Sequence, residues 1–92
     1  MLKTSNKNAR NIVENRCEFN GSNTFGRFES DCYAVYSYGY HFPMFVFKYG
    51  QWHENSEKYS VSTSKQQTQL RPFISGNFTM KSTYELKELI RA

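Results

Sequence analysis

Residues 32–49 carry the strongest pattern in the sequence and restrict the fold more than any other segment. Tyr, Phe and Val recur along it, and aromatic and β-branched side chains favour strands over helices. Successive side chains of a strand point to opposite faces, so residues 32–38 and 44–48 each present two faces. Gly39 and Pro43 separate the two runs, and a proline nitrogen cannot donate a ladder hydrogen bond. The segment therefore predicts two antiparallel strands joined by a turn.

Aromatic side chains have to form most of the hydrophobic core. The 92-residue chain holds 8 Phe, 7 Tyr and 1 Trp, whereas its aliphatic residues are few. Each aromatic ring buries a large area, which compensates for that scarcity. A chain of this length forms one domain, residues 1–92, because it is too short for two independent cores. The composition therefore favours one aromatic core built on a β-sheet.

Weaker patterns extend the sheet in both directions along the chain. Residues 24–29, which follow a turn at residues 20–23, are expected to form an edge strand. Residues 51–53 and 58–63 are expected to add further strands to an antiparallel meander. The polar residues 64–71 are expected to form one or two helical turns, which Pro72 ends.

A helix is expected at each end of the chain. Residues 5–16 have a narrow apolar face, with Ser5 as the cap. Near the C-terminus, Ser82 and Glu85 have the spacing of a capping box. The buried stripe of the helix that follows is Leu86, Leu89 and Ile90. The sequence thus predicts an α+β fold: a central antiparallel sheet of three to five strands in meander order, flanked by an N-terminal and a C-terminal helix.

Charge is unevenly distributed along the chain. The net charge is +4 at pH 7, which excludes an acidic mimic of DNA. Residues 1–28 carry a net charge of +3 and residues 29–57 a net charge of −3. Residues 58–81 carry four basic residues and no acidic residue. Phosphates are contacted by Lys, Arg, Ser and Thr side chains, so the basic stretch 58–71 is a candidate for contacts to nucleic acid.

The sequence shows no sign of export or of a membrane span. No apolar run approaches the ~20 residues that cross a bilayer. The residues from Met1 to Asn6 lack the apolar centre of a secretory signal. Cys17 and Cys32 are too few for a disulfide scaffold. We therefore expect a cytoplasmic protein with reduced thiols and no membrane partner.

Motifs for metal binding and catalysis are weak. The two cysteines and two histidines are the candidate metal ligands, but none are spaced as in C-x-x-C or H-x-x-x-H. The G-x-S-x-G elbow and the P-loop glycine pattern do not occur. We therefore expect no metal, no cofactor and no enzymatic activity. The catalytic alternative is a metal-independent ribonuclease, with one of the histidines as the base and Lys65 or Arg71 as an electrostatic clamp.

Three motifs between residues 33 and 72 resemble a known family. They are YSYGYHFP at residues 36–43, Trp52 with Asn55, and KYSVSTSK at residues 58–65. The same motifs in the same order, roughly YSYG-x-HFP, W-x-x-N-x-x-KYS and TTS-[KR]-H-x-x-Q, occur in small uncharacterised domains that bacteriophages and other mobile elements encode. The chain is similar to that family. It departs from the pattern at Gln66, where the family has His, so chemistry that depends on that His is absent here.

The resemblance implies an origin more than a mechanism. Small phage proteins of this size often act by binding, so the leading hypothesis is a phage-encoded accessory binding protein in the host bacterial cytoplasm. Its partner would be a host protein or a protein–nucleic acid complex. Its activity would be to antagonise a host defence system, as an anti-CRISPR does, by steric occlusion. The alternative is a small DNA- or RNA-binding module that uses residues 58–71. The sequence leaves the oligomeric state open.

The expected binding site combines the turn after residue 38 with the Ser/Thr/Lys stretch. The two segments are expected to converge at one end of the sheet, which brings hydroxyl, amide, cationic and aromatic groups together. The residues of the expected site are His41, Trp52, Tyr59, Thr63, Ser64, Lys65, Gln69 and Arg71.

Overall fold

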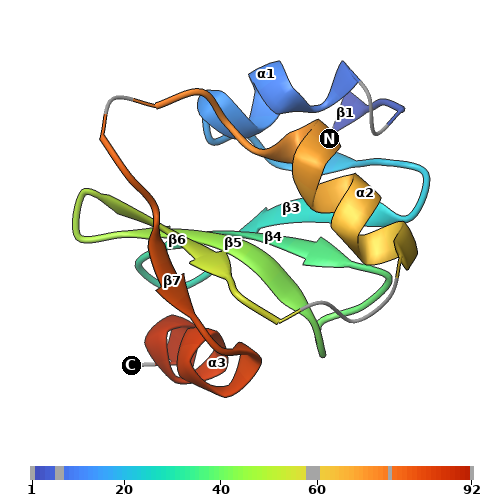
Figure 1. Ribbon diagram of the computed structural model, residues 1–92. Helices are drawn as coiled ribbons and strands as arrows, with labels where there is room; N and C mark the ends of the chain where they lie inside the picture. Colours follow the sequence, from blue (N-terminus) through green and yellow to red (C-terminus); the bar gives the residue numbers. More distant parts are fainter. Residues whose placement is uncertain (1, 6–7, 58–60, 75, 92) are drawn as a thin grey trace.

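One sheet runs through the molecule, and in the described residues it has seven strands with helices on both faces (Figure 1). The computed structural model describes residues 2–5, 8–57, 61–74 and 76–91. In order across the sheet, the strands are β1 (Leu2–Lys3), β2 (Phe19–Asn20), β3 (Thr24–Phe28), β4 (Tyr33–Ser37), β5 (Pro43–Lys48), β6 (Gln51–Asn55) and β7 (Thr79–Lys81). The helices are α1 (Arg10–Glu14), α2 (Val61–Leu70) and α3 (Thr83–Arg91).

The sheet is mixed, because its two outer pairs are parallel. Strands β2 to β6 are antiparallel neighbours, whereas β1 pairs in parallel with β2 and β6 with β7. Parallel neighbours need a crossover connection. Helix α1 lies in the first crossover and α2 in the second. Crossovers between parallel strands are almost always right-handed. Because the strands of both parallel pairs run in the same direction, right-handed crossovers place both helices on the same face of the sheet. Figure 1 shows α1 and α2 above the sheet and α3 below it.

The alternating residues of the central strands form two cores, one on each face. The core on the face of α1 and α2 comprises Ala9, Val13, Phe19, Tyr33, Val35, Phe42, Met44, Phe45, Trp52 and Leu70. The core on the face of α3 comprises Cys32, Ala34, Tyr36, Val46 and Leu86. Aromatic rings fill much of the first core, as the composition predicts, whereas Tyr36 and the partly buried Phe25 supply the rings of the second. Because helices cover both faces, neither face of the central strands is left open as a platform for stacking bases.

The α+β class and the C-terminal helix are confirmed. At the start of α3, the backbone N–H of Glu85 donates to the Ser82 hydroxyl at 3.2 Å. In return, the backbone N–H of Ser82 donates to the Glu85 carboxylate at 2.8 Å. This is the reciprocal geometry of a capping box. The expected apolar stripe packs on the sheet through Leu86, Leu89 and Ile90.

The expected antiparallel meander of three to five strands is wrong in strand number and in pairing. The sheet of the described residues has seven strands and is mixed. Strands β1, β2 and β7 have only two or three residues each, which is too short to produce an alternating pattern in the sequence. The expected edge strand, β3, lies inside the sheet between β2 and β4.

The expected N-terminal helix is shorter than residues 5–16. Helix α1 begins after Ala9, and no side chain caps it. The Ser5 hydroxyl, expected to be the cap, has no hydrogen-bond partner among the described residues. At the other end, Arg16 has a φ of 53°, which leaves the right-handed helical region and ends the helix.

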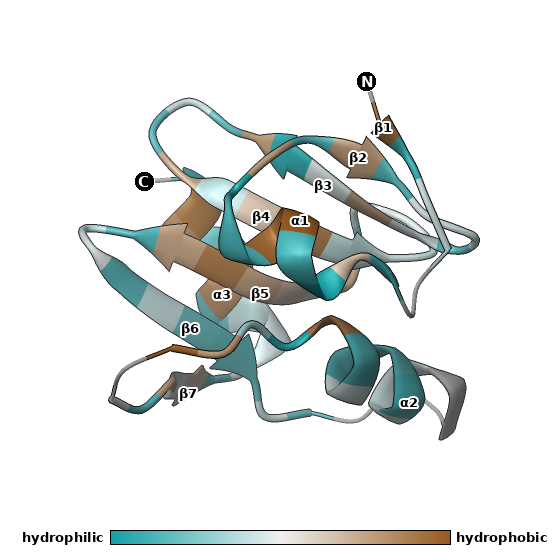
Figure 2. Cartoon of the chain, turned by 90° about the horizontal axis from the view of Figure 1, so that it is seen from above, coloured by the Kyte–Doolittle hydropathy of each residue, from teal (hydrophilic) through white to brown (hydrophobic). Residues whose placement is uncertain are grey.

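The strand expected over residues 58–63 is wrong for the residues described, because Val61–Leu70 form α2. Residues 58–60 lie outside the described residues. The buried positions identified on α2 are Thr63, Gln66, Gln67 and Leu70. They have helical spacing, but only the last is apolar. Figure 2 shows α2 as mostly hydrophilic. The helical turns expected over residues 64–71 are confirmed within α2, but hydrophobic periodicity could not reveal that the helix begins at Val61.

Candidate functional site

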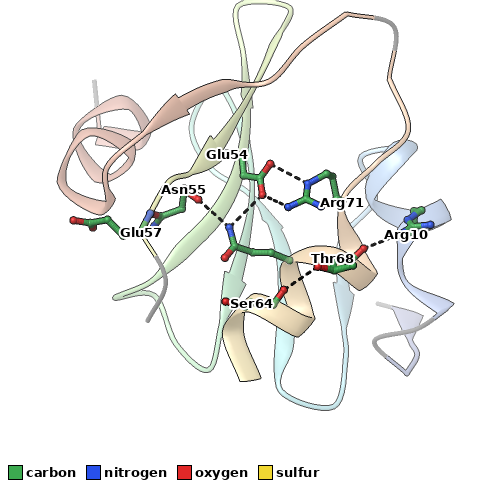
Figure 3. Close-up of polar contacts among 8 residues, drawn as sticks. Arg10, Glu54, Asn55, Glu57, Ser64, Thr68 and Arg71 are labelled. Carbon is green, nitrogen blue, oxygen red and sulfur yellow. Dashed lines mark hydrogen bonds and ion pairs between the residues drawn. The ribbon is translucent and has the colours of Figure 1, made fainter. Parts of the chain in front are cut away.

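Arg71, directly after α2, forms a two-pronged ion pair with Glu54 on β6. Its Nε donates to Glu54 Oε1 at 3.0 Å and its Nη2 to Oε2 at 2.5 Å (Figure 3). Glu54 is only 5% exposed, so its carboxylate depends on these donors more than on water. The hydrogen bond to Glu54 is the main cause of a raised pKa of Arg71. In this structure the predicted binding residue Arg71 fastens α2 to the sheet.

Asn55, the last residue of β6, connects four elements. Its side-chain amide donates to the Pro43 carbonyl of β5 at 2.8 Å and to the Thr83 hydroxyl of α3 at 2.9 Å. Its side-chain oxygen accepts from the backbone N–H of Glu57 at 2.8 Å. Its backbone carbonyl accepts from the Gln67 side chain of α2 at 2.9 Å. Asn55 is buried and has its polar groups paired, so it holds both helical layers on the sheet.

Three polar side chains of α2 are buried against the sheet. Thr63 and Gln67 are fully buried, and Gln66 is nearly so. The Ser37 hydroxyl of β4 donates to the Gln66 side-chain oxygen. The Gln66 nitrogen and the Gln67 side-chain oxygen have no partner in the described part of the chain. A buried amide group without a hydrogen-bond partner lowers the stability of the folded protein. The hydrogen bonding of Gln66 and Gln67 is therefore less complete than that of Asn55.

The other predicted site residues are spread over the molecule. Trp52 is buried in the core on the face of α1 and α2. Lys65 is exposed on α2. His41 lies in the turn between β4 and β5 and lines a cleft beside α3, on the opposite face from α2. Tyr59 lies outside the described residues. The half-buried members on α2 are Ser64 and Gln69. The structure therefore places the α2 members near Arg71 and keeps His41 apart from them.

A cleft that the sequence analysis missed lies at one end of the sheet, between the β3–β4 turn and the β5–β6 turn. This turn-end cleft has a volume of about 470 Å³. Two exposed aromatic side chains line it, Phe28 at 58% and Tyr49 at 80% exposure. The other lining residues are Arg16, Glu29, Ser30, Asp31, Cys32, Tyr33, Phe47 and Lys48. Several separate segments form its walls, so no single pattern along the chain marks it.

Positive and negative groups balance in the turn-end cleft. The buried Lys48 ammonium lies 3.3 Å from the Asp31 carboxylate. The Arg16 guanidinium lies over the Phe47 ring, 4.4 Å from its centroid. Glu29 adds a second carboxylate. Two cations and two anions therefore leave the cleft without net charge, while Arg16 keeps an exposed position at its wall.

Tyr49 occupies a backbone conformation that disfavours it. Tyr49 and Gly50 have φ values of 54° and 72° between the paired residues Lys48 and Gln51. Two positive φ values in a two-residue loop define a type I′ turn, for which Asn-Gly is preferred. The left-handed conformation costs a residue with a side chain about 1–2 kcal/mol. The chain thus keeps an exposed aromatic ring where Asn would be more stable.

The cysteine in the turn-end cleft is not poised for nucleophilic chemistry. Cys32 is 7% exposed, and burial is the main cause of its raised pKa, so the thiol stays protonated. The thiolate is the reactive form of cysteine. Cys17 is exposed, and neither cysteine forms a disulfide.

The described residues contain no group of three or more His, Cys, Asp and Glu side chains that could hold a metal ion. Their helices are all too short or too polar to cross a membrane. Comparisons with protein-family models, with curated proteins and with solved structures find no match to the chain. The geometry of the turn-end cleft and of the buried polar contacts of α2 is therefore the basis for assigning a function.

Proposed function

We propose that this protein is a small binding protein that docks on a protein partner through the turn-end cleft. The observation that carries the proposal is the pair of exposed rings that line one cleft, Phe28 at the end of β3 and Tyr49 in the β5–β6 turn. Phe28 also contacts Tyr33 edge-on at 5.4 Å, which limits its motion. Aromatic residues and Arg are enriched in the centres of protein interfaces and contribute most of their binding energy. Arg16 supplies the guanidinium at the same cleft.

The biological setting of this proposal comes from the family resemblance. Its motifs are similar to those of domains that bacteriophages and other mobile elements encode. We therefore propose a phage-encoded accessory protein that covers a functional surface of a host protein, or of a host protein–nucleic acid complex. Antagonism of a host defence system by steric occlusion, as by an anti-CRISPR, fits a small protein with an aromatic docking surface and no assembled catalytic group among the residues described.

A protein partner fits the turn-end cleft better than nucleic acid does. The cleft has no net charge, and its Lys48 ammonium is already held by Asp31 and by the Leu89 carbonyl at 2.6 Å. Phosphate binding requires cations that are free to replace counterions. The basic stretch 58–71 is a weaker alternative for the same reason, because Arg71 is held by Glu54.

The ribonuclease alternative, with Lys65 or Arg71 as its clamp, lacks support from the positions of these groups. It requires a histidine base and a cation on either side of one phosphate. His41 lies beside α3, whereas Arg71 lies beside α2 on the opposite face of the sheet. His53 is buried on β6, where it is shielded from a large substrate.

The proposal is tested by comparing three tagged proteins in affinity capture from a bacterial host lysate. They are the unaltered chain, the variant Phe28→Ser/Tyr49→Ser and the control Phe73→Ser, which removes a ring outside the cleft that is 76% exposed. We expect one host protein to be captured by the unaltered chain and the control, but not by the double variant. The purified partner should then bind the double variant at least about tenfold more weakly, as for interface residues that contribute most of the binding energy.

Two results would contradict the proposal. Equal capture by the double variant would show that the rings do not contact the partner. Salt-sensitive binding of labelled single-stranded RNA, single-stranded DNA or duplex DNA, with no protein captured, would favour the nucleic-acid module instead. Thermal unfolding of each variant shows whether a loss of binding reflects a loss of fold.

A further inference from the structure

A second cleft lies on the other side of the β3–β4 turn, and the proposed docking surface does not use it. This α3 cleft has a volume of about 530 Å³, within the ~300–1,000 Å³ range of small-molecule sites. Its walls are the β3–β4 turn, the β4–β5 turn and the last turns of α3. Its lining residues are Glu29, Ser30, Tyr36, Tyr40, His41, Lys87, Ile90 and Arg91. It shares only Glu29 and Ser30 with the turn-end cleft.

One wall of the α3 cleft is an exposed aromatic ring that its neighbours hold in place. Tyr40 is 61% exposed. Its ring contacts Phe25 at 5.0 Å and Tyr36 at 4.8 Å, both edge-on. Phe25 and Tyr36 in turn stack on each other at 5.1 Å. A ring fixed in this way loses little conformational entropy when a planar group stacks on it.

The facing wall carries two cations on one side of α3. Lys87 and Arg91 are four residues apart, so they lie one above the other on the helix. No carboxylate in the described part of the chain forms an ion pair with Lys87. Arg91 lies 3.4 Å from Glu88, but both are exposed, and such surface pairs contribute little. Both cations are therefore available to a phosphate.

The β3–β4 turn adds a hydrogen-bond acceptor. One oxygen of Glu29 accepts from the Tyr36 hydroxyl at 2.7 Å. Burial, and then this hydrogen bond, raise the pKa of Tyr36, so its hydroxyl remains a donor and fixes the carboxylate. The second oxygen of Glu29 faces no donor in the described residues and can accept from an amino group.

We propose that the α3 cleft binds a nucleotide unit whose base carries an amino group. The base stacks on Tyr40, its amino group donates to Glu29, and its phosphate lies between Lys87 and Arg91. A free nucleotide and a nucleotide within a single strand present the same chemistry. The arrangement separates a planar aromatic wall from a cationic wall, which matches the separation of base and phosphate in one nucleotide.

The test is a titration followed by amide chemical shifts, with 5′-AMP, adenosine, inorganic phosphate and a short single-stranded oligoadenylate as the probes. We expect 5′-AMP to bind at least about tenfold more tightly than adenosine or phosphate alone, because only 5′-AMP uses both walls. The largest shifts should fall on residues 29–30, 40–41 and 87–91. Tighter binding of the oligoadenylate than of 5′-AMP would identify the single strand as the source of the nucleotide, and the reverse would identify the free nucleotide.

Three variants connect the binding to the cleft. Lys87→Gln/Arg91→Gln should weaken 5′-AMP binding by about tenfold and leave adenosine unaffected, because the phosphate contacts are charge-assisted. Tyr40→Leu should weaken both ligands. The matched control is Lys3→Gln, which removes an exposed cation on β1, outside the cleft. Equal binding of 5′-AMP by Lys87→Gln/Arg91→Gln, equal affinity for phosphate and 5′-AMP, or no shift with millimolar 5′-AMP would overturn the proposal.

Discussion

Gly26 lies on β3 where two aromatic side chains of the core close over the backbone. A Cβ at this position would lie 2.5 Å from the Tyr33 hydroxyl oxygen and 2.6 Å from a ring carbon of Phe19. The Tyr33 hydroxyl cannot move freely, because it donates to the Cys17 carbonyl at 2.7 Å. We predict that Gly26→Ala lowers the free energy of unfolding by about 1–3 kcal/mol, the range for overpacked cores. Urea denaturation measures the change.

The control for this prediction is a glycine that is not crowded. Gly50 has a φ of 72°, and nothing lies within 4 Å of its Cβ position. Gly50→Asn should therefore change stability by less than Gly26→Ala, because Asn tolerates the left-handed region better than other residues with side chains. Equal stability of Gly26→Ala and the unaltered chain would show that the rings can move aside.

His53 gives the molecule a predicted pH dependence. Burial, and then Lys81, lower the pKa of His53 below its ordinary value of about 6.5. The unfolded chain therefore takes up a proton near pH 6.5 that the folded chain does not take up until lower pH. Stability should be highest above pH 6.5 and should fall as the pH drops through the window between the two pKa values. Urea denaturation from pH 5.5 to 7.5 measures this slope.

Two histidine variants isolate the contribution of His53. His53→Gln should flatten the pH slope, because it removes the group whose proton affinity differs between the two states. His41→Gln, at an exposed histidine, should retain it. The same slope in His53→Gln would assign the pH dependence to other groups.

At the scale of elements, α2 shows why part of the fold could not be predicted from the sequence. Its buried stripe consists of Thr63, Gln66, Gln67 and Leu70, and an apolar pattern is the usual signal for a helix face. The helical turns expected over residues 64–71 are confirmed, but the start of the helix was assigned to a strand because only one residue of its buried stripe is apolar. By contrast, the spacing of Ser82 and Glu85 marked the start of α3 in the sequence. Its capping box and its buried apolar stripe were predicted correctly.

Because the ion pair between Arg71 and Glu54 attaches α2 to the sheet, we predict that Arg71 is a structural residue. Arg71→Ala would leave the Glu54 carboxylate, 6% exposed at its side chain, without its ion pair. Removing one partner of a buried charge pair is strongly destabilising, and partial exposure of Arg71 reduces the effect. We expect the free energy of unfolding to fall by about 2 kcal/mol. Lys65→Ala, at an exposed position of the same helix, should stay within about 0.5 kcal/mol.

A second substitution distinguishes the lost pairing from lost packing. Adding Glu54→Gln to Arg71→Ala removes the unpaired charge, so part of the stability should return. Stability of Arg71→Ala equal to that of the unaltered chain would show that water replaces the guanidinium. Arg71 would then be available to a ligand, as the sequence analysis expected.

At the scale of the whole molecule, two short crossovers turn a central meander into a mixed sheet. The strands from β3 to β6 follow the alternating patterns of residues 24–55, and these could be predicted. Strand β1 has two residues and β7 has three, so their pairing depends on where α1 and α2 place them rather than on their own sequence. The candidate clefts have the same origin. Phe28 ends β3, whereas Tyr49 and Tyr40 lie on two separate turns, and only the folded sheet shows which of them share a cleft.

The two clefts meet at Ser30, which is exposed and lines both. A bulky side chain there narrows both spaces while leaving the cores untouched. We therefore predict that Ser30→Trp weakens the capture of the protein partner and the binding of 5′-AMP, with a change in stability of no more than about 0.5 kcal/mol. The capture assay, the chemical-shift titration and urea denaturation measure the three effects.

The selective variants show whether the clefts are separate sites with one shared wall. Phe28→Ser/Tyr49→Ser should affect only the partner, because neither ring lines the α3 cleft. Lys87→Gln/Arg91→Gln should affect only 5′-AMP, because neither cation lines the turn-end cleft. If the cation variant weakens the partner as strongly as the ring variant does, a single ligand must span the β3–β4 turn. The docking surface would then extend from Tyr49 to the last turn of α3.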